Sequence, residues 1–89
     1  IEMPGVYATY VDFEDKVYKS MTYIGKKPTI NAGNDENIEV HLFDFDVDIY
    51  EKDVKIRFVK RIRDERKFDS LEELKQQIMI DEKQIRELL

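Results

Sequence analysis

The sequence predicts a mostly β domain, a small antiparallel barrel or sheet with one C-terminal helix laid against it. Residues alternate between two faces with the period of two that half-buried strands show in residues 5–12, 38–45 and 54–62, and residues 17–24 have β-type composition. After Asp69 the apolar residues recur at helical spacing instead. Several short strands followed by one helix define this fold class, because each element must bury its apolar face against another.

The first two segments are predicted to form a hairpin. Residues 5–12 are rich in Val, Tyr and Thr, which favour strands. The acidic break Glu14-Asp15-Lys16 is typical of a tight turn, and β-type composition resumes after it. Gly25 ends the second strand in this interpretation, because residues 25–37 collect Gly, Pro, Asn and Asp. We therefore expect a long loop between the second and third strands.

The third segment carries a carboxylate among aromatic residues. Alternation in residues 38–45 puts Glu39, His41 and Phe43 on one face. A carboxylate can act as a general base toward a hydroxyl when it lies within about 3 Å and has a suitable pKa. An exposed strand glutamate with a locally bonded histidine would show the same pattern, so the residues alone leave both interpretations open.

The last two predicted elements are both amphipathic. Residues 54–62 and the following Arg63 alternate between an apolar face and a basic face, which includes Arg61 and Arg63. Ser70 with Glu73 matches the capping box that starts a helix. The inner face of that helix is predicted to carry Leu71, Leu74, Ile78, Ile85 and Leu88.

A basic turn precedes the helix. Arg63, Arg66 and Lys67 can donate to phosphate or ring oxygens, and Phe68 can pack on a planar ring. The alternative is a solvated turn with Phe68 in the core. Only the combination of this turn with the Glu39 strand indicates a site, at which a phosphoryl acceptor would meet a carboxylate and cations.

Length and composition limit the function classes. The chain has 89 residues, which suits a single domain, and it has no cysteine and one histidine, so no metal site is assigned. The net charge of −5 argues against nucleic-acid binding. No apolar run approaches the roughly 18 residues that span a bilayer. We expect a soluble, cytoplasmic domain without a membrane partner.

Several ordered motifs resemble one family along almost the whole chain. They are Gly5-Val6-Tyr7-Ala8, Ile24-Gly25 with Lys27-Pro28-Thr29, Glu39-Val40-His41-Leu42 with Asp44-Phe45, Asp48-Ile49-Tyr50, and the stretch from Arg63 to Leu71. This order is similar to that of the riboflavin kinases, including the C-terminal kinase module of bacterial bifunctional FAD synthetases. The resemblance implies a six-stranded Greek-key barrel that phosphorylates riboflavin to FMN with ATP and Mg²⁺.

The resemblance also implies residue roles and a partner domain. Glu39 would be the catalytic base, Arg63, Arg66 and Phe68 would bind the flavin, and Leu42, Asp44 and Tyr50 would bind the adenine nucleotide. An N-terminal FMN adenylyltransferase domain would accompany the module in the parent protein. Residues 1–89 would then be one riboflavin kinase-like domain.

The chain departs from the family pattern in three places. The Pro-Thr-Ala-Asn segment, whose Thr and Asn hold metal and phosphates in the family, precedes the Gly-Val-Tyr strand and is not in this sequence. Glu51 replaces the usual glycine, and Asp64 replaces the usual proline. We therefore expect a partial domain, active within a longer protein and impaired in isolation.

A binding module without catalysis is the competing hypothesis. A barrel lacking N-terminal strands would expose an unpaired edge, which invites strand addition or oligomerisation. Such a chain would bind flavin or a protein partner only.

Overall fold

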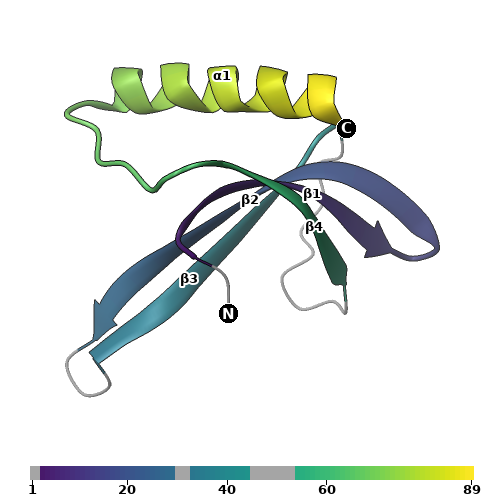
Figure 1. Cartoon of the computed structure of the whole chain (residues 1–89), viewed down its shortest axis with the longest axis horizontal. Helices are drawn as coiled ribbons and strands as arrows, with labels where there is room; N and C mark the ends of the chain where they lie inside the picture. Colours follow the sequence, from purple (N-terminus) through teal and green to yellow (C-terminus); the bar gives the residue numbers. More distant parts are fainter. Residues whose placement is uncertain (1–2, 30–32, 45–53) are drawn as a thin grey trace.

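The computed structural model describes residues 3–29, 33–44 and 54–89. It contains the strands β1 (Gly5–Phe13), β2 (Lys16–Thr29), β3 (Gly33–Leu42) and β4 (Lys55–Arg63), and the helix α1 (Leu71–Leu88), arranged as Figure 1 shows. The four strands form one antiparallel sheet in the order β3-β2-β1-β4.

The strand order is that of a Greek key. The first three strands follow one another, and the fourth returns to pair with the first. This confirms the prediction of a mostly β antiparallel fold with one C-terminal helix. The resemblance implied six strands, and the described part of the chain contains four.

The β1–β2 hairpin closes where the sequence predicts it. Glu14 and Asp15 both have positive φ, 48° and 65°. Two consecutive residues of this kind make the type I′ turn, whose twist matches that of the flanking strands. The acidic break therefore sets the register of the sheet, in which Phe13 pairs with Lys16.

The prediction that Gly25 ends the second strand is wrong. β2 continues through Gly25 to Thr29 and pairs with β3 as far as Gly33, so the expected long loop is mostly an extended hairpin. A Cβ atom at Gly25 would lie 2.3 Å from the hydroxyl oxygen of Tyr23. Glycine is needed here because the Tyr23 side chain covers the strand, not because the backbone turns.

Two β-bulges interrupt the pairing of β4 with β1, so the side-chain alternation is reset twice. Arg61 lies opposite Tyr7, whereas Arg63 lies opposite Val6. Neighbouring β1 residues face opposite sides of the sheet, so the two arginines do too, and the prediction of a shared basic face is wrong. The predicted apolar face is also incompletely buried, since Phe58 is 40% exposed.

Helix α1 covers one face of the sheet (Figure 1). Ile85 of the helix is fully buried against Val6, Ala8 and Phe43. A second apolar cluster forms on the other face of the sheet around Val11, Phe13 and Leu42. Glu39 and His41 lie on the helix-covered side of the sheet, so a site that contains them lies between the sheet and the helix.

The helix begins at its predicted cap. The Ser70 hydroxyl accepts a hydrogen bond from the Glu73 amide at 3.2 Å, and the Glu73 carboxylate accepts one from the Asp69 amide. Three predicted inner residues are instead exposed, Leu71 by 72%, Leu88 by 44% and Ile78 by 36%. None of the helices in the described part of the chain is long and apolar enough to cross a membrane.

Candidate functional site

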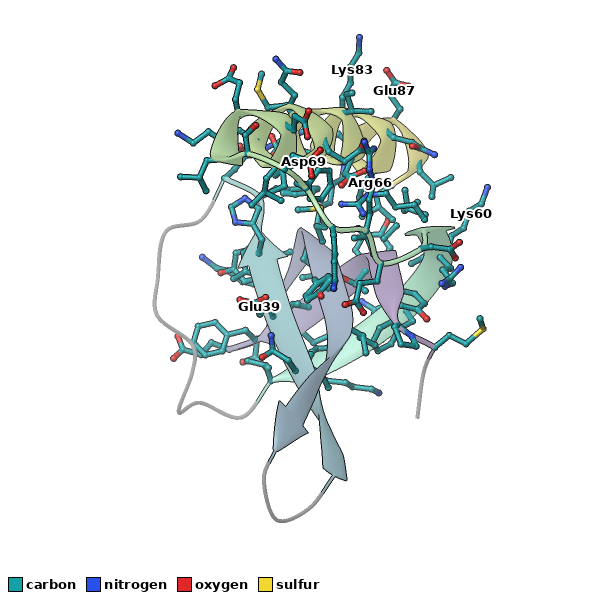
Figure 2. All side chains as sticks on the ribbon, turned by 90° about the vertical axis from the view of Figure 1, so that its left-hand side faces the viewer. Glu39, Lys60, Arg66, Asp69, Lys83 and Glu87 are labelled. Atoms are coloured by element: carbon teal, nitrogen blue, oxygen red, sulfur yellow. The ribbon has the colours of Figure 1, made fainter. Side chains whose placement is uncertain are left out.

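A cavity of about 660 Å³ opens between the sheet and α1. All four strands, the turn after β4 and the helix contribute to its wall. The lining residues are Val6, Met21, Tyr23, Glu39, Val40, His41, Arg63, Arg66, Phe68, Leu74, Ile78 and Asp81. Figure 2 shows Glu39 on the sheet and Arg66 between the sheet and the helix.

The structure brings together the two parts of the predicted site. Glu39 and His41 from β3 and Arg63, Arg66 and Phe68 from the basic turn all line this cavity. Their convergence results from the fold, since β4 crosses beside β1 and α1 then returns over the sheet. A carboxylate, an aromatic ring and two guanidinium groups thus line the same cavity.

Phe68 lies beside both arginines. The centre of its ring is 4.8 Å from the guanidinium carbon of Arg66 and 5.8 Å from that of Arg63. Both distances fit cation–π attraction. The cluster therefore combines a flat apolar surface with fixed donors, which suits a planar ligand that has polar edges.

Arg63 is anchored by a residue that the sequence interpretation missed. Its Nη2 atom lies 2.8 Å from Oδ2 of Asp81, and its Nε donates to the same carboxylate at 2.9 Å. The Arg63 side chain is 20% exposed and that of Asp81 is 2% exposed. The available signal was spacing, because Asp81 lies on the helix stripe that also carries Leu74, Ile78 and Ile85.

Glu39 and Tyr23 are cross-strand neighbours in the cavity wall. They form one pair of the β2–β3 register, so both side chains face the same way. Glu39 is exposed, and the Asn37 amide donates to its Oε2 at 3.5 Å. Burial raises the pKa of the Tyr23 hydroxyl above its usual 10.0, and Glu65 and Glu39 reinforce that rise. Tyr23 thus keeps its proton beside the carboxylate.

Two of the three predicted nucleotide residues, Leu42 and Asp44, do not line this cavity. Leu42 is 7% exposed in the apolar cluster on the opposite face of the sheet. Asp44 is 77% exposed in its side chain and binds Arg86. This pairing lowers the pKa of Asp44, chiefly through the hydrogen bond from Arg86. Tyr50 lies outside the described residues.

The described residues contain no group of three or more His, Cys, Asp or Glu side chains that could hold a metal ion. They therefore offer no dedicated cage for the Mg²⁺ that the resemblance implies.

A Greek-key sheet with one helix packed over a cavity defines a small, mostly β domain. The chain belongs to the riboflavin kinase family, whose model matches residues 1–89. The bifunctional riboflavin kinase/FMN adenylyltransferase of Bacillus subtilis is 43% identical over 82 residues, which cover 90% of this chain and 26% of that protein. The Escherichia coli protein of the same name is 42% identical over 93% of this chain.

The chain is also similar to a riboflavin kinase of another name and to a solved structure. The RNA-binding riboflavin kinase RibR of Bacillus subtilis is 38% identical over 86% of this chain and 34% of that protein. A crystal structure described as a macrolide-efflux protein from Streptococcus pneumoniae superposes with a TM-score of 0.85 and 37% identity, covering 93% of this chain and 27% of that one. The chain spans about a quarter of the length of its bifunctional relatives.

Proposed function

We propose that this chain is the riboflavin kinase part of a longer protein and transfers the γ-phosphoryl group of ATP to the ribityl 5′-hydroxyl of riboflavin. One observation carries the proposal. The residues that the family motifs assign to base and flavin, far apart in the sequence, line one cavity in the structure. Its volume is within the range of roughly 300–1,000 Å³ that is usual for small-molecule sites.

The flavin ring would occupy the end of the cavity near Phe68. Its flat apolar area would pack on the phenyl ring, and its carbonyl oxygens would accept hydrogen bonds from Arg63 or Arg66. The ribityl chain would then extend toward β3, where Glu39 lies.

Glu39 would act as the general base. Its carboxylate would accept the proton of the 5′-hydroxyl as that oxygen bonds to the γ-phosphorus, while the bond from phosphorus to the ADP oxygen breaks. Protein catalysis of phosphoryl transfer consists mainly of positioning and charge stabilisation. The exposure of Glu39 leaves it accessible to a ligand that enters the cavity.

The nucleotide would bind at a second place, which Leu42, Asp44 and Tyr50 would help to form. Mg²⁺ would accompany ATP as the usual phosphate-bound ion. The parent protein would also carry an adenylyltransferase domain, since the similar proteins of Bacillus subtilis and Escherichia coli are bifunctional riboflavin kinase/FMN adenylyltransferases. We further propose that residues 1–89 form one partial domain, whose isolated activity is impaired.

A phosphorylation assay tests the proposal. The longer protein that contains this chain is incubated with riboflavin, ATP and Mg²⁺, and FMN is separated by chromatography. We expect FMN from the unaltered protein and from the control Glu87→Gln, whose side chain points away from the sheet in Figure 2, but a loss of at least about a hundredfold in Glu39→Gln. Unchanged FMN formation by Glu39→Gln would remove that residue from its role, and flavin binding without any FMN would favour a binding module.

A further inference from the structure

Two residues on one face of α1 connect the two cavity arginines by hydrogen bonds. Asp81 accepts from Arg63, as described above. Gln77 lies one turn earlier, where its Oε1 accepts from Nη1 of Arg66 at 3.1 Å and its Nε2 donates to Oδ1 of Asp81 at 2.9 Å. A continuous series of side-chain hydrogen bonds therefore links Arg66 to Arg63 by way of Gln77 and Asp81 on the helix. Both arginines lie beside Phe68.

The burial of Asp81 is unusual for a carboxylate. The residue as a whole is 1% exposed, at a helix position where an apolar side chain would pack between Ile78 and Ile85. A buried ion pair often stabilises a fold no better than apolar residues of the same volume, because both charges lose their hydration. The ion pair at this position therefore points to a role in fixing geometry.

The two hydrogen bonds of Gln77 fix the orientation of its side-chain amide. Its amide oxygen faces a guanidinium group, which only donates, and its amide nitrogen faces a carboxylate, which only accepts. A flipped amide would lose both hydrogen bonds. The position of Arg66 is thus coupled to that of Asp81 through one fixed side chain.

We propose that Gln77 and Asp81 are positioning residues for the flavin site. They hold the guanidinium groups of Arg63 and Arg66 beside Phe68 before the ligand arrives, so that binding does not have to order two long side chains. This inference rests on the proposed function, because it assigns the flavin ring to these arginines.

Riboflavin affinity, measured by quenching of flavin fluorescence with the 89-residue chain, tests the inference. We expect Asp81→Asn to weaken binding at least about tenfold, Gln77→Leu to weaken it several-fold, and the matched control Glu87→Gln to leave it unchanged. In an Arg63→Met background, Asp81→Asn should weaken binding less than it does in the unaltered chain, because only its path through Gln77 to Arg66 remains. Folded Asp81→Asn and Gln77→Leu variants with unchanged affinity would overturn the inference.

A second readout needs no ligand and covers the case in which Asp81→Asn fails to fold. The guanidinium N–H signals of Arg63 and Arg66 are recorded by NMR, where immobilised groups give slowly exchanging, resolved signals. We expect Gln77→Leu to broaden the Arg66 signals and leave those of Arg63 resolved. Unchanged Arg66 signals would overturn the positioning role of Gln77. Resolved signals in a chain that binds no riboflavin would overturn the assignment of the flavin to these arginines, whereas the FMN assay of the longer protein tests the proposed function separately.

Discussion

Arg86 in the last turn of α1 binds Asp44, just after β3, through two parallel hydrogen bonds of 2.9 and 3.1 Å. The same guanidinium group lies 4.6 Å from the ring centre of Phe43, and its Nε donates to Oε2 of Glu82, one helical turn earlier, at 3.2 Å. This contact joins the C-terminal end of the helix to the residue that follows β3 in the sheet.

The Arg86–Asp44 pair predicts that the stability of the folded chain depends on pH. Since Arg86 lowers the pKa of Asp44, the folded state holds that proton less tightly than the unfolded state. The stabilisation is therefore present above the usual value of 3.8 and is lost as the pH falls through the lower folded value. We expect Asp44→Asn, which tolerates the positive φ at this site, to lower the denaturation midpoint at neutral pH but not in strong acid. An equal difference at both pH values would contradict this assignment.

The helix cap should make a measurable contribution to stability. Ser70→Ala removes the acceptor for the Glu73 amide, and we expect a loss of about 1 kcal/mol in the free energy of unfolding. Ser70→Asp keeps an acceptor and is the control. Equal stability of the alanine and aspartate variants in chemical denaturation would show that the cap is unimportant.

The sheet–helix contact depends on Ile85. Because this side chain is fully buried, Ile85→Ala should cost roughly 2–5 kcal/mol in unfolding free energy. Ile80 lies on the same helix but is 59% exposed, so Ile80→Ala should have a much smaller effect. Similar losses for both variants would mean that the helix does not pack on the sheet by the face described.

Gly25 is predicted to matter through Tyr23. A Cβ at position 25 would meet the hydroxyl and ring of Tyr23, so Gly25→Ala should destabilise the chain and displace that ring from the cavity wall. Thermal unfolding of the double variant with Tyr23→Ala provides the check. We expect the added cost of Gly25→Ala to shrink when the ring is absent, whereas additive costs would rule out the contact as the cause.

Phe68 should contribute to flavin affinity. Phe68→Leu keeps an apolar side chain but removes the flat ring, so we expect riboflavin to bind several-fold more weakly. Phe58→Leu is the matched control, because Phe58 lies on the opposite face of the sheet and packs on Tyr7 at 5.2 Å. An equal loss in both variants would indicate general damage to the fold.

Local patterns predicted much of this structure. The period of two placed Glu39 and His41 on one face, and the Ser70 signal fixed the start of the helix. Features set by contacts between elements could not be read in this way. The bulges in β4 depend on its pairing with β1. Gly25 was predicted to end β2 because the amino-acid composition does not reveal that the Tyr23 ring covers this position.

The anchoring of the site shows the same limit. An aspartate in an apolar helix stripe gives no indication of its partner until the fold places Arg63 beside it. Gln77 likewise carries no signal of its own, since its two hydrogen bonds join a turn and a helix. Long-range polar contacts of this kind follow from tertiary structure alone.

The most direct test of the flavin assignment is an NMR titration of the chain with riboflavin, followed through its backbone amides. We expect the largest shifts at Glu39, Arg63 and Phe68 and along the inner face of α1, with Lys60 and Lys83, which point away from the cavity in Figure 2, unaffected. Shifts that cluster on the opposite face of the sheet around Phe58, or no saturable shifts at all, would contradict a flavin site between the sheet and the helix.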